Sequence, residues 1–438
     1  MQKTSHPLEK LVQPMVGLIS RVDRLPISPG EPEFPIHLSS LGDISHSLTQ
    51  IKRATQGRSI SGGMDGAGGS TDVTESRIRS MAEGLERYSS CTYDESQFIW
   101  ATADELGDDA MDLRKVPVCS DAELRHPKCG VINPVTDAPI RWVKGISLLD
   151  QREVWVPAIM TYLHLTAESI GERFWLPIST GCAAHVSIEE ALISAICEVI
   201  ERDSISLTWL QQLPLPHIEF DEMDEDMRQF LKQTNKGGHI QQYIFDATTD
   251  IGVPTIYSVQ ITPHNRKLAA LVMCATDLDP KRAIKKVMRE AASSRIAMLA
   301  DREIPENIDD FYQVVHGAVY MGKPEHIGAY DFLTNSPHRR VVSQLKNLDT
   351  GNAVDNLNKL LNILSIKNLD AYVVDLTTDE ALKVGMRVVR VIIPGLQPLS
   401  FSHRSRFLGH PRLYTAPVAM GYAAKTEEQL NPWPQPFA

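Results

Sequence analysis

The sequence predicts a mixed α/β (α+β) protein with duplicated helix and sheet layers and two or three subdomains. Its 438 residues, 42% of them hydrophobic, exceed the roughly 250–300 residues at which a single core usually divides. Three segments carry apolar residues at helical spacing, and extended segments lie between them. Two strand-like segments end in the same motif, Asp-x-Thr-Thr-Asp, which begins at Asp246 and at Asp375. This echo indicates a duplicated organisation with partly parallel strands.

The N-terminal part differs in composition from the rest. Residues 1–55 are Pro-rich and lack sustained periodicity, so we expect an extended N-terminal segment there. Residues 56–438 are expected to form the main domain, which ends in a Pro-x-Pro-x-Pro tail. The main domain begins with a glycine-rich stretch, SGGMDGAGG, that leads into the first helix. Three residues qualify as the N-cap of this helix: Thr71, Asp72 and Thr74.

Extended segments and two further helices follow. Residues from about 113 to 165 have the alternation of strands, as in IRWVKGISLL and EVWVPAIM. A second turn of small residues, STGCAAH, leads into a strongly amphipathic helix over residues 186–203. The third long helix is predicted from about Pro280 to Ala300.

Composition excludes several classes of protein. A net charge of -11 argues against a nucleic-acid binder, which normally carries a basic face. There is no apolar run of about 18 residues to span a membrane, and Met1–Leu25 lacks the apolar core of a secretory signal. Six cysteines in so long a chain are too few for a disulfide framework. We therefore expect a cytoplasmic protein with reduced thiols.

Acidic residues repeat on two of the predicted helices. At about 100° per residue, Glu190, Glu198 and Glu201 fall within an arc of about 80°, beside the apolar stripe. Glu83 and Glu86 lie about 60° apart on the first helix. A single Glu-x-x-Glu is usually a solvated helix face. Two copies, each after a turn of small residues, instead favour carboxylates that face one cleft and hold a cation.

Such a cleft suits magnesium and a nucleotide. Mg²⁺ prefers hard oxygen ligands and commonly bridges carboxylates to substrate phosphates. Arg87, Arg202 and Arg295 are candidates to neutralise phosphate by forked hydrogen bonds. The chain contains no Walker motif, G-x-x-x-x-G-K-[ST]. The residues alone therefore indicate a metal–nucleotide site of another kind.

These motifs, taken in order, resemble the YcaO family, and within it the branch that forms azolines in ribosomally made peptides. The resemblance covers roughly residues 55–438. Four features carry it: EGLERY after the glycine-rich stretch, STGCAAHVSIEEALISAICEVIERD, DPKRAIKKVMREAASSR, and VVDLTTDEALKVGMRVVRVIIPGLQPLSF with the proline-rich C-terminus. The expected fold is therefore of the YcaO type.

The resemblance implies an ATP-dependent cyclodehydration with ATP and Mg²⁺ as cofactors. A Cys, Ser or Thr side chain attacks the preceding amide, ATP phosphorylates the resulting oxyanion, and phosphate leaves as the azoline ring closes. By the same resemblance, the nucleotide-binding residues are Glu83, Glu190, Arg202, Arg295 and Ser179, and the magnesium ligands are Glu86, Glu198 and Glu201. The resemblance also implies that the tail residues Pro432, Pro434 and Pro436 order the site and that the carboxylate of Ala438 serves as a base.

The chain departs from the family pattern in three loops or turns. A lysine common in the family is missing around Gly68-Gly69-Ser70, Ala184-His185-Val186 replaces Ala-Gly-Asn, and Ser293 replaces a glutamine. His185 is a candidate base, although a loop histidine is more often structural. These differences leave the carboxylates intact.

The azoline branch also implies partners. We expect a precursor peptide with a leader, and a leader-binding partner that resembles a ubiquitin-activating enzyme, because residues 1–55 are too short for a winged-helix leader-binding module. A flavin-dependent azoline oxidase is a further candidate partner, and a homodimer is expected. Two alternatives stay open at this point: thioamide or amidine formation at the same ATP site, and a non-catalytic nucleotide-binding scaffold.

Overall fold

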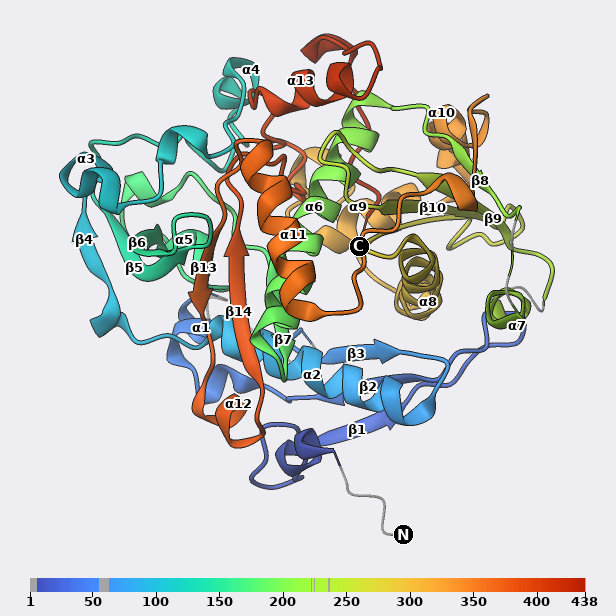
Figure 1. Ribbon diagram of the computed structural model, residues 1–438, viewed down its shortest axis with the longest axis horizontal. Helices are drawn as coiled ribbons and strands as arrows, with labels where there is room; N and C mark the ends of the chain where they lie inside the picture. Colours follow the sequence, from blue (N-terminus) through green and yellow to red (C-terminus); the bar gives the residue numbers. More distant parts are fainter. Residues whose placement is uncertain (1–5, 55–62, 222, 224, 235–236, 438) are drawn as a thin grey trace.

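Three β-sheets organise the chain in the computed structural model, which describes residues 6–54, 63–221, 223, 225–234 and 237–437 (Figure 1). The first sheet has the order β1-β2-β3, the second β11-β10-β9-β8-β12, and the third β4-β5-β13-β14-β7 with β6 on β5. The strands of the three sheets are β1 (Arg21–Arg24), β2 (Ile36–Ser40), β3 (Gly66–Gly69), β4 (Ile99–Ala101), β5 (Ile140–Ser147), β6 (Arg152–Pro157), β7 (Cys182–His185), β8 (His217–Glu219), β9 (Gln241–Asp246), β10 (Thr255–Ile261), β11 (Ala270–Thr276), β12 (Arg339–Val341), β13 (Tyr372–Asp375) and β14 (Arg387–Ile392).

Helices cover and separate these sheets, so the protein is mixed α/β as expected. They are α1 (Thr49–Ala54), α2 (Val73–Cys91), α3 (Ala103–Leu106), α4 (Asp121–Arg125), α5 (Ala158–Thr161), α6 (Ile188–Gln211), α7 (Glu225–Thr234), α8 (Pro280–Leu299), α9 (Val314–Met321), α10 (Asp331–Thr334), α11 (Ala353–Ile366), α12 (Asp379–Lys383) and α13 (Arg412–Ala419). None of the helices in the described ranges is both long and apolar enough to cross a membrane.

Residues 66–69 of the glycine-rich stretch form β3, which lies directly on α2. Asp72 caps α2 by accepting a hydrogen bond from the backbone N–H of Glu75, which selects one of the three predicted caps. A Cβ at Gly66 would lie 2.2 Å from the carbonyl oxygen of Ser80, and one at Gly68 would lie 2.4 Å from that of Ser76. Only glycine therefore lets β3 approach α2 so closely.

The helix α6 runs through the middle of the molecule, between the second and third sheets (Figure 1). It packs on β7 and β14 on one side and on β10 and β11 on the other. The prediction ended this helix near Asp203, but it continues to Gln211. Ile205, Leu207 and Trp209 alternate as in a strand, yet all three are buried because this half of the helix is enclosed on every side. Because this half of α6 is buried on every side, it lacks the amphipathic pattern on which the prediction of the helix end relied.

The strand directions differ from the expectation of partly parallel sheets. Among the paired strands of the described residues, β8 and β12 are the only parallel pair, and the other ladders are antiparallel. The predicted echo is nevertheless visible in local geometry. Asp246 and Asp375 end β9 and β13, and each accepts a hydrogen bond from the N–H two residues later. Both strands then return as antiparallel partners, so the repeat encodes a turn and not a crossover.

The N-terminal residues are built into the main unit. The predicted boundary at residue 55 falls in the range 55–62, outside the described residues, but β2 precedes it and pairs with β3 beyond it. Further contacts come from Phe34, which is fully buried and stacks on Phe230 of α7 with ring centroids 5.3 Å apart. Residues before the boundary therefore complete a sheet, although their composition suggested a separate extended segment.

We expect Gly68→Ala to lower the free energy of unfolding by about 1–3 kcal/mol, because the added methyl group overlaps the α2 backbone. Gly69→Ala in the same strand is the matched control, since its added Cβ would have no atom nearer than 3.6 Å. Denaturant unfolding of both variants measures the difference. Equal losses of stability would contradict the close contact between β3 and α2.

Candidate active site

Carboxylates from two helices meet near the centre of the molecule. Glu86 lies on α2, and burial raises the pKa of its carboxyl well above the ordinary value, with further contributions from the negative charges of Glu198 and Glu83. Arg87 and Arg390 oppose this effect. The acidic faces predicted on α2 and α6 thus converge, and a bound cation would relieve the repulsion between them.

The turn before β7 holds Glu198 in place. The N–H of Gly181 donates a hydrogen bond of 2.9 Å to one oxygen of Glu198. Gly181 has a φ of 83°, and a Cβ there would lie 2.2 Å from the carbonyl oxygen of Val391, so the position requires glycine. Ser179 belongs to the same turn, where its carbonyl accepts a hydrogen bond from the N–H of Cys182 at 2.9 Å. The predicted loop residue therefore lies beside a predicted metal ligand.

Glu201 lies deeper, at 2% exposure, in a set of positive and N–H partners. The N–H of Thr276 on β11 donates to one of its oxygens at 3.0 Å, and Lys286 Nζ on α8 lies 3.4 Å from the same oxygen. Arg202 bridges the two acids of α6, with one nitrogen 2.9 Å from Glu198 and another 3.2 Å from Glu201. These partners stabilise a carboxylate that would be costly to bury alone.

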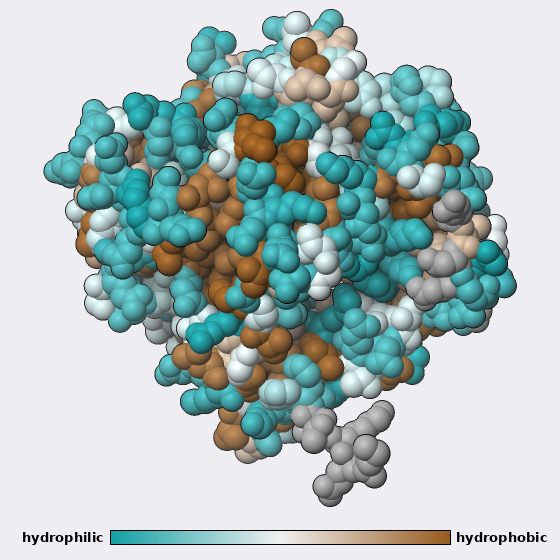
Figure 2. Space-filling view, in the orientation of Figure 1, coloured by the Kyte–Doolittle hydropathy of each residue, from teal (hydrophilic) through white to brown (hydrophobic). Residues whose placement is uncertain are grey.

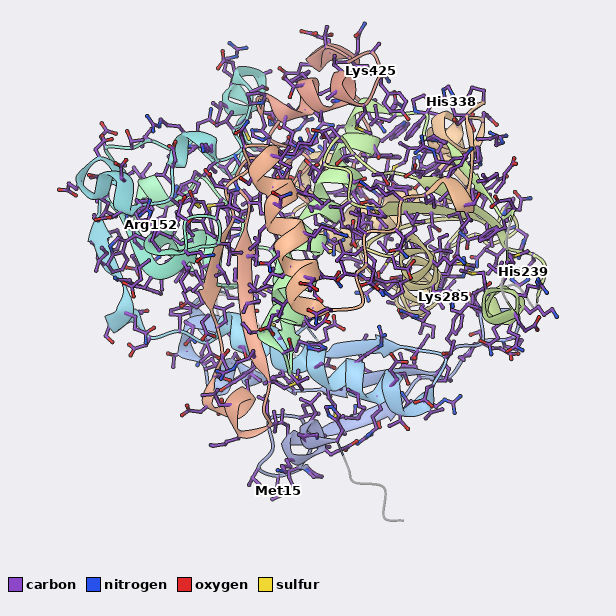
Figure 3. All side chains as sticks on the ribbon, in the orientation of Figure 1. Met15, Arg152, His239, Lys285, His338 and Lys425 are labelled. Carbon is purple, nitrogen blue, oxygen red and sulfur yellow. The ribbon has the colours of Figure 1, made fainter. Side chains whose placement is uncertain are left out.

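A second acid on α8 approaches the same cluster. Glu290 lies one turn after Lys286, and its oxygen is 4.0 Å from Lys286 Nζ. Burial and the charge of Glu201 raise the pKa of Glu290 to about 7, while Lys286 and Arg202 act in the opposite direction. Figure 3, where the neighbouring Lys285 is labelled, locates this stretch of α8. The helix thus adds one acid and one cation to the group.

Two of the predicted nucleotide-binding glutamates lie at the edges of the cluster. Glu83 accepts a hydrogen bond from the N–H of Ala67 on β3 at 2.7 Å and pairs with Arg87 at 2.6 Å. Glu190 is half-buried in the first turn of α6. It precedes Glu198 by eight residues, which is about 12 Å along a helix axis. The structure therefore places Glu190 apart from the acids that meet at the centre.

Arg295 does not join the group in this structure. Its side chain is only 1% exposed and forms a forked pair with Glu31 of the N-terminal segment, in which one of the two hydrogen bonds measures 2.9 Å. Its remaining terminal nitrogen donates to Gln260 at 3.4 Å. All three guanidinium nitrogens are thus occupied by protein groups, whereas the sequence predicted that they face a nucleotide. Helical spacing cannot show that a segment more than 250 residues earlier supplies the partner.

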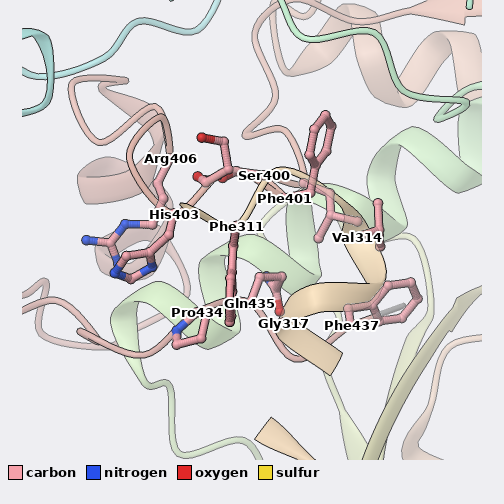
Figure 4. Close-up of a pocket in the computed structure, with 12 residues that line it drawn as sticks. Phe311, Val314, Gly317, Ser400, Phe401, His403, Arg406, Pro434, Gln435 and Phe437 are labelled. Carbon is pink, nitrogen blue, oxygen red and sulfur yellow. The ribbon is translucent and has the colours of Figure 1, made fainter. Parts of the chain in front are cut away.

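The proline-rich tail is ordered and reaches the cluster. Pro434, Pro436 and Phe437 are buried, and the ring centroid of Phe437 lies 4.6 Å from the guanidinium carbon of Arg202. At Gly317 of α9 a Cβ would lie 2.0 Å from the carbonyl oxygen of Gln435, so the tail passes directly over that glycine (Figure 4).

Further contacts fix the beginning of the tail. The indole N–H of Trp209 on α6 donates to the carbonyl oxygen of Trp433 at 3.2 Å. Pro432, the first of the three tail prolines, is exposed, and Ala438 lies outside the described residues. The extended tail expected from the sequence is therefore held at both ends, by Trp433 and by Phe437.

Two cations near the acids were not selected from the sequence. Arg390 on β14 is 3% exposed and donates to the carbonyl oxygen of Ile178 at 2.7 Å and to Cys182 Sγ at 3.2 Å. A single arginine within the apolar run VVRVIIP was the available signal. Lys286 is one of several lysines and arginines of α8, and only its contact with Glu201 in the folded protein distinguishes it from the others.

The donor set is compatible with magnesium and phosphate. Within the described ranges, no three His, Cys, Asp or Glu side chains are arranged to hold a metal ion by themselves. Mg²⁺ commonly uses only one or two carboxylates and completes its shell with water and phosphate oxygens. Glu86, Glu198 and Glu201 supply such carboxylates, and Arg202 supplies a fork suited to phosphate.

The chain is similar to a known protein family and to a relative of known sequence. The family model described as YcaO cyclodehydratase, ATP- and Mg²⁺-binding, matches residues 67–397. An uncharacterised protein of Methanothermobacter thermautotrophicus is 26% identical over 343 residues, which are 76% of this chain and 82% of that protein.

Two solved structures share the fold. A heterocyclase in complex with substrate and cofactor has a TM-score of 0.78 and 22% identity, covering 99% of this chain and 57% of its own. The chain thus spans little more than half the length of that protein. The E. coli microcin synthetase McbBCD complex with pro-MccB17 bound has a TM-score of 0.62 and 14% identity, covering 98% of this chain and 99% of its own.

In the metal-free protein we expect stability to fall as the pH rises from about 4.5 to about 7. The raised pKa of Glu290 means that the folded state holds a proton that the unfolded chain releases earlier. The slope should be shallow, because 39% of this side chain is exposed and water screens its charge. Glu290→Gln should flatten the slope in denaturant unfolding measured across this range. An unchanged slope in that variant would contradict the assignment.

Proposed function

This chain belongs to the YcaO family, and from that premise we propose that it is the catalytic subunit of an ATP-dependent, Mg²⁺-dependent peptide cyclodehydratase. The substrate is a ribosomally made precursor peptide, in which Cys, Ser or Thr residues become azolines. The observation that carries the proposal is the meeting of Glu86 and Glu198 beside Arg202, at the point where the ordered tail ends.

The reaction removes one water from the peptide for each ring. The side-chain thiol or hydroxyl attacks the carbonyl carbon of the preceding amide, and the amide nitrogen later loses its proton as the C=N bond forms. ATP supplies the phosphoryl group that turns the amide oxygen into a leaving group, and Mg²⁺ neutralises phosphate charge. The protein holds the reacting groups in line and keeps water away from them.

Each group in the cluster has a distinct part in this proposal. Glu86, Glu198 and Glu201 would hold magnesium, and Arg202, which is paired with Glu198 and Glu201, would donate its remaining N–H bonds to phosphate oxygens. Glu83, with Ala67 at β3, borders the nucleotide. The turn that contains Ser179 contributes backbone N–H groups at the same edge. Glu190 can contact the nucleotide only if binding moves α6. Arg295 can do so only if binding releases it from Glu31.

The tail gives the site its specificity for ring formation. Pro432, Pro434 and Pro436 restrict φ, so the segment loses little entropy when it is held in place. Phe437 lies against Arg202, and by the family resemblance the residue after it, Ala438, is proposed to supply the base that accepts a proton. This tail favours azoline formation over thioamide or amidine formation at the same ATP site.

Partners complete the assignment. A separate protein that resembles a ubiquitin-activating enzyme binds the leader of the precursor, in keeping with the multi-protein microcin synthetase that shares this fold. A flavin-dependent oxidase acts on the azolines afterwards. The reaction takes place in the cytoplasm, where ATP and magnesium are available. Mixing the chain with precursor and partner should yield product lighter by one water per ring, and no mass loss would contradict the proposal.

A homodimer is part of the proposal, because the molecule has an exposed apolar surface. Figure 2 shows apolar side chains over the region of α11 and its neighbouring strands. On α11 itself, Val354 and Ile366 are 52% and 69% exposed. Surfaces of this kind commonly mark protein–protein contacts. A monomer mass in light scattering at micromolar concentration would contradict this part.

We expect Glu198→Gln to reduce ATP hydrolysis about 100-fold or more while the fold stays intact, because it removes a ligand charge from the metal. The neutral amide keeps the size of the side chain and can still accept from Gly181. Glu189→Gln on the same helix is the matched control, since Glu189 bonds Ser187 at the N-cap and faces no other acid in the cluster. Phosphate release measures turnover, and circular dichroism checks the fold. Undiminished turnover in folded Glu198→Gln would refute the magnesium assignment.

We expect Gly317→Ala to cut ring formation far more than nucleotide affinity, because the added methyl group displaces the tail at Gln435. Deletion of residues 432–438 or a C-terminal tag should have the same effect, since a base must lie within hydrogen-bond reach of its proton. Gly328→Ala is the control, because its Cβ would meet nothing nearer than 3.9 Å. Product mass and nucleotide titration give the two readouts. Equal losses in both would show that the tail is merely structural.

A further inference from the structure

A small cavity lies beside Arg202. It is lined by residues of α6, of the loop before β7, of β14 and of the segment that follows β14, and most of its wall is apolar. Its volume is ≈ 40 Å³. Because a buried water needs about 10–15 Å³ on this measure, there is room for a group of about three non-hydrogen atoms. A purine base is therefore too large, and the nucleotide is not the occupant.

The walls of this cavity hold an unusual share of unpaired polar atoms. Twelve buried side-chain nitrogen or oxygen atoms lack a hydrogen-bond partner within the part of the chain that the structure describes. Four of the twelve belong to residues that line this cavity: Trp175 Nε1, Arg202 Nη1, Arg390 Nε and Gln397 Oε1. Arg202 Nη1 is ion-paired with Glu201 at 3.2 Å, so three of the four are without a partner. Arg390 and Gln397 are 3% and 1% exposed. Buried polar groups are nearly always bonded, so this concentration calls for a ligand.

The unpaired atoms define the chemistry of that ligand. Two are donors, the indole N–H of Trp175 and Nε of Arg390, and one is the acceptor oxygen of Gln397. Gln397 cannot turn freely to find another partner, because its amide nitrogen already donates to the carbonyl oxygens of Arg406 and Phe407 at 3.2 Å. A backbone amide offers the complementary pair, a carbonyl that accepts and an N–H that donates, in a planar group of three non-hydrogen atoms.

The position of the cavity connects it to the reaction. Arg202 lines the cavity and pairs with Glu198, and its guanidinium group lies over the ring of Phe437 in the tail. A peptide held here is thus within one side chain of both the proposed magnesium site and the tail. We propose that this cavity is a substrate subsite that binds the backbone amide next to the one that is cyclised, with Arg390 as donor and Gln397 as acceptor. The inference rests on the proposed peptide cyclodehydratase function.

A double-mutant cycle with a short peptide tests the subsite. The test peptide is N-acetyl-Gly-Cys-Gly-amide, and its two analogues carry a methyl group on one or the other glycine nitrogen. Dissociation constants are measured by NMR titration of the full chain with Mg²⁺ and a non-hydrolysable ATP analogue. Gln397→Met keeps the length of the side chain and removes the acceptor. We expect it to weaken the peptide about tenfold, the loss typical of one buried hydrogen bond.

The analogues separate a direct contact from a structural effect. One of them should bind wild-type protein about tenfold more weakly than the parent peptide, and Gln397→Met should weaken that analogue no further. Gln211→Met is the control, because Gln211 is equally buried at 2% exposure but bonds Leu413 and Lys425 away from the cavity. Arg390→Lys should weaken the parent peptide and both analogues alike.

Two results with Gln397→Met would overturn the subsite. One is unchanged peptide affinity in folded Gln397→Met, which would mean that the cavity holds only water. The other is a full additional loss for both analogues in that variant. Nucleotide binding is read in the same titration without peptide, so failure of the ATP site is recognised separately. A chain that binds the nucleotide but not the parent peptide at millimolar concentration would also refute the subsite.

Discussion

The charge balance along one turn of α6 is the constraint on which the structure depends. Glu198, Glu201 and Arg202 lie on a helix that is enclosed by two sheets, where unpaired charges are very costly. The neighbouring elements supply groups that pair with these charges. β11 supplies an N–H, α8 supplies Lys286, and the turn before β7 supplies the N–H of Gly181. The long helix, the glycine turn and the approach of α8 are thus parts of one electrostatic arrangement.

The same arrangement explains how an apolar interior can hold several acids. Lys286 and Arg202 provide resident positive charge that offsets part of the negative charge of Glu201 and its neighbours. The acids remain strained, as the raised pKa values of Glu86 and Glu290 indicate. A divalent cation would therefore bind to carboxylates that are already gathered and incompletely neutralised. Pre-organisation of this kind reduces the reorganisation that accompanies binding.

The sequence predicted the local features of the site better than its long-range contacts. The fold class and the convergence of the acidic helix faces follow from periodicity and from the repeated Glu-x-x-Glu, and the N-cap Asp72 is one of the three candidates that the sequence left open. The pairing of Arg295 with Glu31 does not, because the partner comes from a distant segment without a motif. Arg390 was not predicted for a related reason. The role of a charged residue in a strand depends on what packs against it, and the sequence does not show that. The prediction of partly parallel strands was wrong because the repeated aspartate motif forms turns.

The central place of α6 also bears on how the molecule comes apart. Its N-terminal half packs in the core around α11 and the third sheet, and its C-terminal half packs in the core around the second sheet. Neither core can open without exposing part of the same helix. Subdomains that share a buried helix lose their independence, so we expect these two cores to unfold together. The amide hydrogens of α6 should then be among the slowest to exchange with solvent, and two of the proposed magnesium ligands, Glu198 and Glu201, lie on this helix.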